Sequence, residues 1–383
     1  MHIVFGEIRM FSSKSLAVLA VGLLFVGGSL VGWNYSNAQQ MPTNPANQKS
    51  VSASPTPTVS PTPKIEEDDE VIKIDTEVVN VLFSAQDKER RLMLDLKQTD
   101  VRLIEDGQPQ EITAFARQID LPLSLAILID ASGSQERTLP EEKAAAKSFI
   151  ESVVRAAKDE VSIISFTGEA TLEQGMTNNI ARLGRAVDRV RFVPPSGYIG
   201  GGVIAGGTPP ISGGNQTAFG STAIWDAIWI TSDEVLKNSP DKTRRAIVLL
   251  TDGINTYGKK KLDDAVQAAL KNEVVIYSVG IGDDFAYQGV DEPVLKKISE
   301  RTGGRAFFPR NEKELRQAFA QIQIELRSQF LIAYESSNQK RDGSYRKIEI
   351  QLVNPELAKQ KIKLTHRQGY FAKTESVQPK KSK

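Results

Sequence analysis

The sequence predicts an α/β protein: a doubly wound, mostly parallel sheet with helices on both faces, flanked by a small β unit built from the N- and C-terminal segments. Three observations support this fold class. Between residues 121 and 328, short apolar runs alternate with segments of helical period. The apolar runs are nearly continuous, as in strands that are covered on both faces. Before and after this part, apolar and polar residues alternate around Asp-Gly turn signals, which is typical of antiparallel strands.

Residues 1–38 are predicted to be a signal peptide or a membrane anchor. An uncharged apolar run extends from Ser15 to Trp33, directly after Arg9 and Lys14. Its length favours a retained transmembrane helix, whereas the small residues around Ala38 favour cleavage. In both cases we expect export: the remaining chain would be secreted or periplasmic, or held outside the cytoplasmic membrane by a single N-terminal helix.

Residues 39–70 are predicted to be a disordered linker. They are rich in Pro, Thr and Ser, contain few large apolar residues and end in an acidic run at 66–70. Such a composition cannot bury a core, and its prolines favour extended conformations. The basic residues 374–383 are predicted to be a disordered tail.

Two β segments enclose the central domain. Residues 71–120 contain strand-like alternation and an Asp106-Gly107 turn, and residues 329–373 return to the same pattern with an Asp342-Gly343 turn. Because the chain ends of an inserted domain often lie close together, we expect these two segments to pair into one unit.

Residues 121–328 form the predicted central domain. Its helical segments cover residues 140–157, 179–190, 221–237, 261–271, 292–302 and 312–328. Its buried strands cover residues 123–130, 161–166, 245–252, 274–282 and 305–308. Strand–helix alternation of this length is typical of a doubly wound sheet.

One connection, residues 194–220, is rich in glycine and has no period. It is too long for an ordinary loop in a compact domain, so it is either a functional surface loop or a mobile insertion. Neither a P-loop motif nor a strand-linked dinucleotide motif occurs in it, which argues against a phosphate cradle.

Composition excludes several classes of function. The 48 Lys and Arg residues and 47 Asp and Glu residues leave a formal net charge of +1, so no global field favours nucleic acid. The absence of cysteine excludes disulfides, thiolate metal sites and a cysteine nucleophile. A Ser–His–Asp hydrolase would depend on His366 alone, since the other histidine, His2, lies in the targeting segment.

Five oxygen-bearing residues are placed where strands end and helices begin. Asp130 ends the first buried strand, Ser132 and Ser134 follow it, Thr222 opens a helix, and Asp252 ends a later strand. In a doubly wound sheet these positions share one rim. Hard oxygen ligands without nitrogen or sulfur favour Mg²⁺ first, with Mn²⁺ or Ca²⁺ as alternatives. Asp226, one turn after Thr222, is interpreted as a structural hydrogen-bond partner.

These five positions resemble the metal-ion-dependent adhesion site of von Willebrand factor type A domains. The resemblance extends over roughly residues 122–327, and the flanking segments resemble a group of exported bacterial proteins that contain such a domain. It implies that the two serines and the threonine contact the metal and that the aspartates act largely through water. The insertion at 194–220 departs from the family pattern beside Thr222.

The favoured function is therefore a non-enzymatic, exported, metal-dependent adhesion or scaffold module. It would capture an acidic residue of a protein partner, because neutral hydroxyl ligands leave the cation electron-poor. Two alternatives stay open: a structural cell-envelope protein with a vestigial metal site, and a Mg²⁺-dependent phosphohydrolase. The second lacks an acid–base aspartate two residues after Asp130, where Ser132 stands.

Overall fold

The computed structural model describes residues 78–118, 120–194, 198–200, 203–204, 221–240, 242–282 and 289–374. All of them belong to one compact unit, Ile72–Lys383. The predicted export segment and linker lie outside the described residues, as does nearly all of the predicted tail. In the described ranges, helices that combine the length and the apolar character needed to cross a bilayer are absent.

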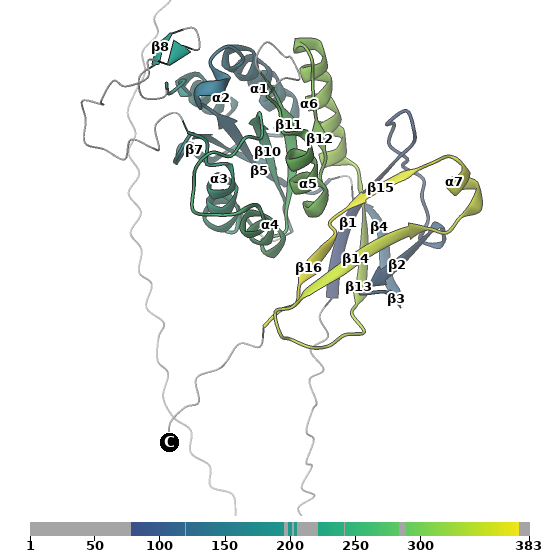
Figure 1. The fold of residues 1–383 in the computed structure, drawn as a ribbon. Helices are drawn as coiled ribbons and strands as arrows, with labels where there is room; N and C mark the ends of the chain where they lie inside the picture. The colour runs from purple at the N-terminus through teal and green to yellow at the C-terminus, as the bar shows by residue number, and fades with distance from the viewer. Residues whose placement is uncertain are drawn as a thin grey trace, which may run out of the picture. The chain divides into compact units, whose positions relative to one another are not determined.

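A six-stranded sheet forms the centre of the α/β domain, in the order β12-β11-β10-β5-β6-β7 (Figure 1). Its strands are β5 (Leu123–Asp130), β6 (Glu160–Phe166), β7 (Ala170–Thr177), β10 (Arg244–Thr251), β11 (Val274–Gly280) and β12 (Ala306–Phe307). Neighbouring strands are parallel except at the edge, where β7 runs antiparallel to β6. The predicted doubly wound, mostly parallel sheet is confirmed.

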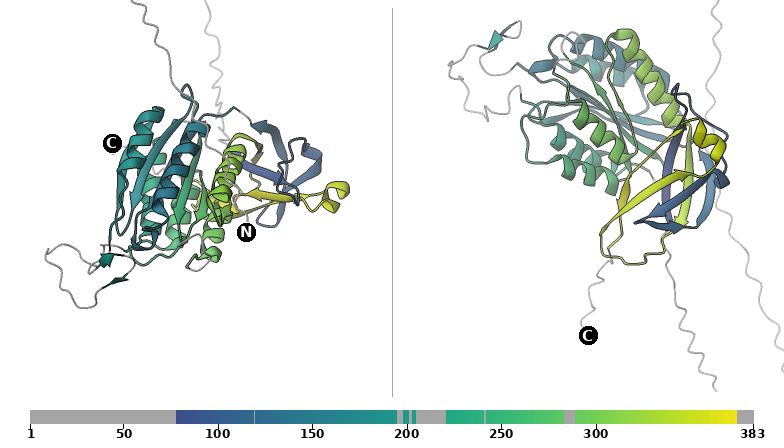
Figure 2. Two further views of the ribbon diagram at one scale, coloured as in Figure 1. Left: turned by 90° about the horizontal axis from the view of Figure 1, so that it is seen from above. Right: turned by 45° about the vertical axis from the view of Figure 1, so that its right-hand side comes forward.

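Helices cover both faces of this sheet (Figure 2). One face packs against α1 (Leu139–Val153), α2 (Ile180–Arg189) and α6 (Glu312–Arg327). The other packs against α3 (Ile224–Ile230), α4 (Leu262–Lys271) and α5 (Glu292–Thr302), with α3 continuing into the π-helical turn η3 (Thr231–Leu236). Alternate side chains of β5 enter the two cores, since successive strand residues point to opposite faces. This explains why the strand is apolar throughout.

The β module, residues 78–118 together with 329–374, consists of two antiparallel sheets in the orders β15-β1-β13-β4 and β16-β14-β2-β3. Its strands are β1 (Val78–Gln86), β2 (Val101–Glu105), β3 (Gln108–Gln110), β4 (Ile112–Gln118), β13 (Gln329–Glu335), β14 (Tyr345–Leu352), β15 (Lys363–His366) and β16 (Gly369–Phe371). Two short helices accompany them, η1 (Gln98–Asp100) and α7 (Pro355–Lys359). Because β1 lies between β13 and β15, the N- and C-terminal segments do form a single β unit, as predicted.

The predicted Asp106-Gly107 turn closes the β2–β3 hairpin. Both residues have positive φ angles, 47° and 83°. This left-handed conformation matches the twist of a two-residue hairpin and is tolerated by Asp and Gly.

The short features that were not predicted include the edge strand β7, helix α7 and a two-stranded hairpin inside the glycine-rich insertion. The hairpin pairs β8 (Tyr198–Gly200) with β9 (Val203–Ile204). The rest of the insertion after Pro194 lies outside the described residues.

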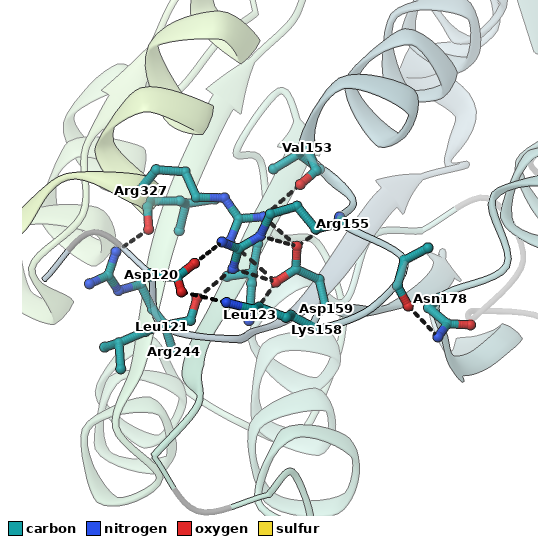
Figure 3. A network of polar contacts seen from close by, with 12 residues as sticks. Asp120, Leu121, Leu123, Val153, Arg155, Lys158, Asp159, Asn178, Arg244 and Arg327 are labelled. Atoms are coloured by element: carbon teal, nitrogen blue, oxygen red, sulfur yellow. Dashed lines mark hydrogen bonds and ion pairs between the residues drawn. The ribbon is translucent and has the colours of Figure 1, made fainter.

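A polar network ties the end of α6 to the amino ends of the central strands (Figure 3). The buried carboxylate of Asp159 accepts the backbone N–H of Leu123 at 3.0 Å and hydrogen bonds from the guanidinium groups of Arg155 and Arg327. Arg327 also donates to the carbonyl oxygen of Val153 at 2.6 Å, at the last residue of α1. The network therefore joins α1, α6 and the start of β5 through one buried acid.

Candidate metal centre

The predicted metal ligands lie at the carboxyl edge of the central sheet. Asp130 is the last residue of β5, and Asp252 directly follows β10. These strands are neighbours, with Leu250 opposite Ile129. The chain continues from β5 to β6 on one side, whereas β10 lies on the other side, so the strand order reverses between the two aspartates. Doubly wound sheets bind their ligands at this point.

Hydrogen bonds from Ser132 and Thr251 orient the fully buried Asp130 carboxylate. Its Oδ1 accepts the backbone N–H of Ser132 at 3.0 Å, and its Oδ2 accepts the hydroxyl of Thr251 at 2.6 Å. Thr251 is the last residue of β10, so this contact also links the two strand ends.

The two serines lie on the turn that leads from β5 towards α1, where Gly133–Gln135 form the short helix η2. The Oγ atoms of Ser132 and Ser134 are 3.4 Å apart, and the Gln135 amide donates to Ser134 at 3.3 Å. The side chains of Ser134 and Gln135 also donate hydrogen bonds to Asp252. Asp252 accepts the backbone N–H of Ile254 at 2.9 Å as well.

Thr222 is buried immediately before α3, and its backbone is fixed to the loop that follows Asp252. Its N–H donates to the Thr256 hydroxyl at 2.9 Å, and its carbonyl accepts the N–H groups of Thr256 and Tyr257 at 2.9 and 3.1 Å. The structure thus joins Asp130, Ser132, Ser134 and Asp252 through side-chain contacts and places Thr222 beside the loop of Asp252 through backbone contacts.

The two aspartates are buried close together without a cationic partner among the described residues. Burial, followed by the nearby charge of Asp252, raises the pKa of Asp130 to about 7. Burial also raises the pKa of Asp252. Among the residues that the structure describes, neither carboxylate forms an ion pair with a basic side chain. Two neighbouring buried carboxylates without a cationic partner are the electrostatic setting that a divalent cation relieves.

The available donors fit a hard cation. Within the described ranges, no cluster of three or more His, Cys, Asp or Glu side chains could hold a metal ion. A site at this rim would therefore combine two carboxylates with the hydroxyls of Ser132, Ser134 and Thr222. Such an all-oxygen set suits Mg²⁺, Mn²⁺ or Ca²⁺.

Sequence reasoning missed three side chains around the centre: Thr251, Gln135 and Glu142. Glu142 is fully buried in the first turn of α1, and burial raises its pKa to about 8, with Asp130 and Asp252 adding to the rise. Its spacing from Ala145, Ala146 and Phe149 places it on the buried stripe of the helix, a signal that was readable in the sequence. Thr251 and Gln135 gave no comparable signal. Each lies next to a motif residue, at a position where nothing in the sequence sets it apart from other polar residues.

Asp226 has the structural role expected of it. Its carboxylate accepts the backbone N–H groups of Lys259 and Lys260 at 3.1 and 3.0 Å and so holds the loop after Asp252. Gly258 has φ = 112°, and a Cβ there would lie 2.1 Å from Asp226 Oδ2, so the approach requires glycine. His366 lies in β15 of the β module and pairs with Phe83, so it is not part of the rim.

Comparison with known proteins identifies the domain type. Residues 125–255 and residues 214–321 match two sequence models of the von Willebrand factor type A domain. A search of curated proteins gave no match.

Several solved structures resemble the chain at low identity. BatB from Bacteroides thetaiotaomicron, a conserved hypothetical protein, is 16% identical over 53% of this chain and 98% of its own, with a TM-score of 0.39. Proximal thread matrix protein 1 from the mussel byssus, with a zinc-occupied MIDAS motif, is 18% identical over 58% of this chain and 49% of its own, with a TM-score of 0.42. A von Willebrand factor type A protein from Catenulispora acidiphila is 14% identical over 80% of this chain and 76% of its own, with a TM-score of 0.41. This chain spans about half the length of the mussel protein.

Proposed function

This chain belongs to the von Willebrand factor type A domain proteins, and from that premise we propose that it is an exported, divalent-metal-dependent module that captures an acidic residue of a partner protein. The observation that carries the proposal is the convergence of Asp130, Ser132, Ser134 and Asp252 on one rim, where the two buried carboxylates have no described basic partner. Export rests on the sequence of residues 1–38.

The proposed centre uses the hydroxyls of Ser132, Ser134 and Thr222 as metal contacts, with Asp130 and Asp252 acting largely through water. The bound cation, Mg²⁺ first and Mn²⁺ or Ca²⁺ as alternatives, would supply a positive charge for an incoming ligand. Neutral hydroxyls donate little charge, so a partner carboxylate completes the coordination favourably. The protein contributes the orientation: Thr251 and the Ser132 N–H fix Asp130, and Gln135 fixes Ser134.

We favour binding over catalysis because the described rim offers hydroxyls and carboxylates without a histidine or a second aspartate two residues after Asp130. Phosphoryl transfer on an aspartate would need a general acid–base group at that place, which Ser132 cannot supply.

The test is a pull-down with residues 65–383, which contain every described element, against an immobilised panel of peptides with exposed carboxylates. We expect Mg²⁺-dependent capture that a chelator abolishes. Asp252→Ala and Thr222→Ala should lose capture and keep the wild-type circular dichroism spectrum, because rim groups contribute little to the core. Asp95→Ala, which removes an exposed carboxylate of the β module, is the matched control. Unfolding of both rim variants, or capture that survives the chelator, would overturn the assignment.

A further inference from the structure

We propose a second ligand site, an open groove of about 550 Å³ between helix α4 and strands β14 and β16, which binds a sugar ring of an uncharged oligosaccharide. Helix α4 and strand β16 lie side by side (Figure 1), and Phe371 of β16 packs against the core to which α4 belongs. The described residues that line the groove include none of the five proposed metal ligands, so the proposal is independent of the metal centre. The volume is within the usual range of small-molecule sites.

The floor of the groove is the exposed face of β14 and β16. Buried and exposed residues alternate along β14, and Tyr345 and Lys347 are on the exposed side. The buried side chains between and after them, such as Ile348 and Ile350, belong to the core of the β module. Phe371 stands opposite Tyr345 in the antiparallel pair. Because opposite residues share a face of the sheet, Tyr345, Lys347 and Phe371 lie together at the groove.

Tyr345 combines a fixed position with an accessible ring. Its ring contacts Phe371 edge to face, with the ring centroids 5.3 Å apart and an interplanar angle of 62°. A Cβ at position 369 would overlap with Cζ and Oη of Tyr345, so Gly369 allows the ring to lie against the backbone of β16. Tyr345 is nevertheless 43% exposed. A rigid, accessible aromatic ring offers a large contact area and loses little conformational entropy when a ligand packs on it.

Two glutamines place unused amide groups beside this ring. Gln267 of α4 is half-buried, and Gln368, directly before β16, is exposed. Neither side chain forms a hydrogen bond with another described residue. Each amide offers two N–H donors and one carbonyl acceptor, which matches sugar hydroxyls, since these also donate and accept. Because both side chains are accessible to solvent, a ligand can reach these groups without a rearrangement of the core.

Neighbouring polar contacts fix the wall that faces the sheet. Arg301, in the last turn of α5, donates to the carboxylate of Asp263 at 2.5 Å. Asp264 accepts the backbone N–H of Lys261 at 2.8 Å, at the start of α4. These contacts join the ends of two helices and orient the two carboxylates, which keep lone pairs for ligand hydroxyls. The wall is therefore preorganised for neutral hydrogen-bonding groups.

The combination of an aromatic ring with accessible amides favours a sugar over other ligands. A pyranose ring has a face of C–H groups that packs on an aromatic ring, and its hydroxyls project from the edge towards donors and acceptors. An apolar ligand would cover the amides of Gln267 and Gln368 without replacing their hydrogen bonds to water. An open-chain polyol would bond the amides but has no ring face to cover Tyr345.

The experiment is calorimetric titration of residues 65–383 with four uncharged probes, cellotetraose, maltotetraose, mannotetraose and tetra-N-acetylchitotetraose, and with the open-chain polyol sorbitol as comparison. We expect saturable 1:1 binding of at least one tetrasaccharide and no saturable binding of sorbitol. Binding should persist with a chelator and in Asp130→Ala, because the groove does not include the metal centre. Absence of binding by all four tetrasaccharides, or equal binding of sorbitol, would refute the site.

Variants locate the binding in the groove. Tyr345→Ala should weaken the bound tetrasaccharide by about tenfold or more, whereas Tyr345→Phe, which keeps the ring, should weaken it less. Gln267→Ala and Gln368→Ala should each weaken it by about threefold or more through the loss of a hydrogen bond. Gln317→Ala, which removes an exposed glutamine of α6, is the matched control.

Circular dichroism shows whether each variant is folded. If Tyr345→Ala fails to fold, the two glutamine variants decide the result. Wild-type affinity in both glutamine variants, wild-type affinity in folded Tyr345→Ala, or an equal loss in Gln317→Ala would overturn the assignment.

Discussion

At the scale of single residues, Glu142 shows how buried acids at the metal centre lower the stability of the metal-free protein. It is a third buried acid beside Asp130 and Asp252, and each of the three has a raised pKa. Such groups lower stability at neutral pH, because the unfolded chain ionises them freely while the folded chain does not. Residues kept for a binding site commonly have this effect on stability.

Replacing Glu142 should therefore stabilise the metal-free protein in a pH-dependent way. The ordinary pKa of 4.5 rises to about 8 in the folded state, so the wild type loses stability as pH increases from about 4.5 to 8. Glu142→Gln should have a higher melting temperature than wild type at pH 8 with chelator present, and the difference should shrink at pH 4.5. Thermal unfolding at both values is the measurement, with the exposed Glu151→Gln as control. A variant less stable than wild type at pH 8 would contradict this account.

Gly258 is a second residue whose contribution to stability can be measured with a single substitution. Alanine at φ = 112° is strained, and its Cβ would displace the Asp226 carboxylate that holds the Lys259 and Lys260 amides. We expect Gly258→Ala to lower the free energy of unfolding by about 1–3 kcal/mol. Gly184→Ala, in α2 with its nearest neighbour 3.9 Å away, should instead stabilise by up to about 1 kcal/mol. Equal effects of the two changes, measured by urea unfolding, would show that Gly258 is not constrained.

The residues of the candidate site illustrate what a sequence can reveal. The five proposed ligand positions were found because each lies where a strand ends or a helix begins. The periodicity of apolar residues predicts these strand ends and helix starts. Thr251 was missed although it bonds Asp130, because only the register of β5 against β10 brings the two together. A contact between residues that are 121 positions apart has no local signature in the sequence.

At the scale of elements, strands covered on both faces were the easiest to predict. Strand β5 was predicted with its observed bounds, since a short, nearly continuous apolar run between polar segments is typical of a strand that is covered on both faces. Strand β7 was missed because it is an antiparallel edge strand in which Leu172 is 55% exposed and polar residues dominate. Helix α7 spans only five residues, too short for a period to be seen.

The polar network around Asp159, at the end of α6, leads to a prediction about stability at this scale. Burial alone would raise the pKa of Asp159, but hydrogen bonds from Arg155 and Arg327 lower it to about 2. Its contribution to stability is thus present above pH 4 and lost as pH falls towards 2. Asp159→Asn should lower the free energy of unfolding by about 3 kcal/mol at pH 7, because it leaves two arginines unpaired. The measurement is urea unfolding at pH 7 and at pH 3. The difference in the free energy of unfolding between wild type and variant should be smaller at pH 3. Asp263→Asn, which changes an exposed ion pair, is the control. A change below about 0.5 kcal/mol at pH 7 would show that the network does not hold the helix.

At the scale of the whole molecule, the α/β domain and the β module share their boundary elements. Helix α6 ends at Arg327, and the central strand β13 begins at Gln329. The buried Glu325 of α6 accepts a hydrogen bond at 2.9 Å from Gln86 of β1. The sequence predicted that both chain ends build one β unit, but it did not predict the contact between Gln86 and Glu325, because these residues are 239 positions apart in the chain.

This shared boundary predicts cooperative unfolding. Residues 65–383 should unfold in one calorimetric transition. Residues 121–328 alone should unfold at a lower temperature, because the buried Glu325 loses its hydrogen bond from Gln86. Two separate transitions, with the α/β domain melting at the same temperature alone and in the longer chain, would show that the parts are independent.

Metal binding is the claim on which the proposed function depends, and it is measured most directly by calorimetric titration of residues 65–383 with Mg²⁺ and Mn²⁺, wild type beside Asp130→Ala. We predict saturable binding at one site in the wild type, with proton release near pH 7 because the cation displaces the proton of a carboxyl whose pKa is about 7. The variant should bind neither ion. Wild-type protein that binds neither ion, with or without a carboxylate ligand present, would contradict the account and favour a structural role with a vestigial site.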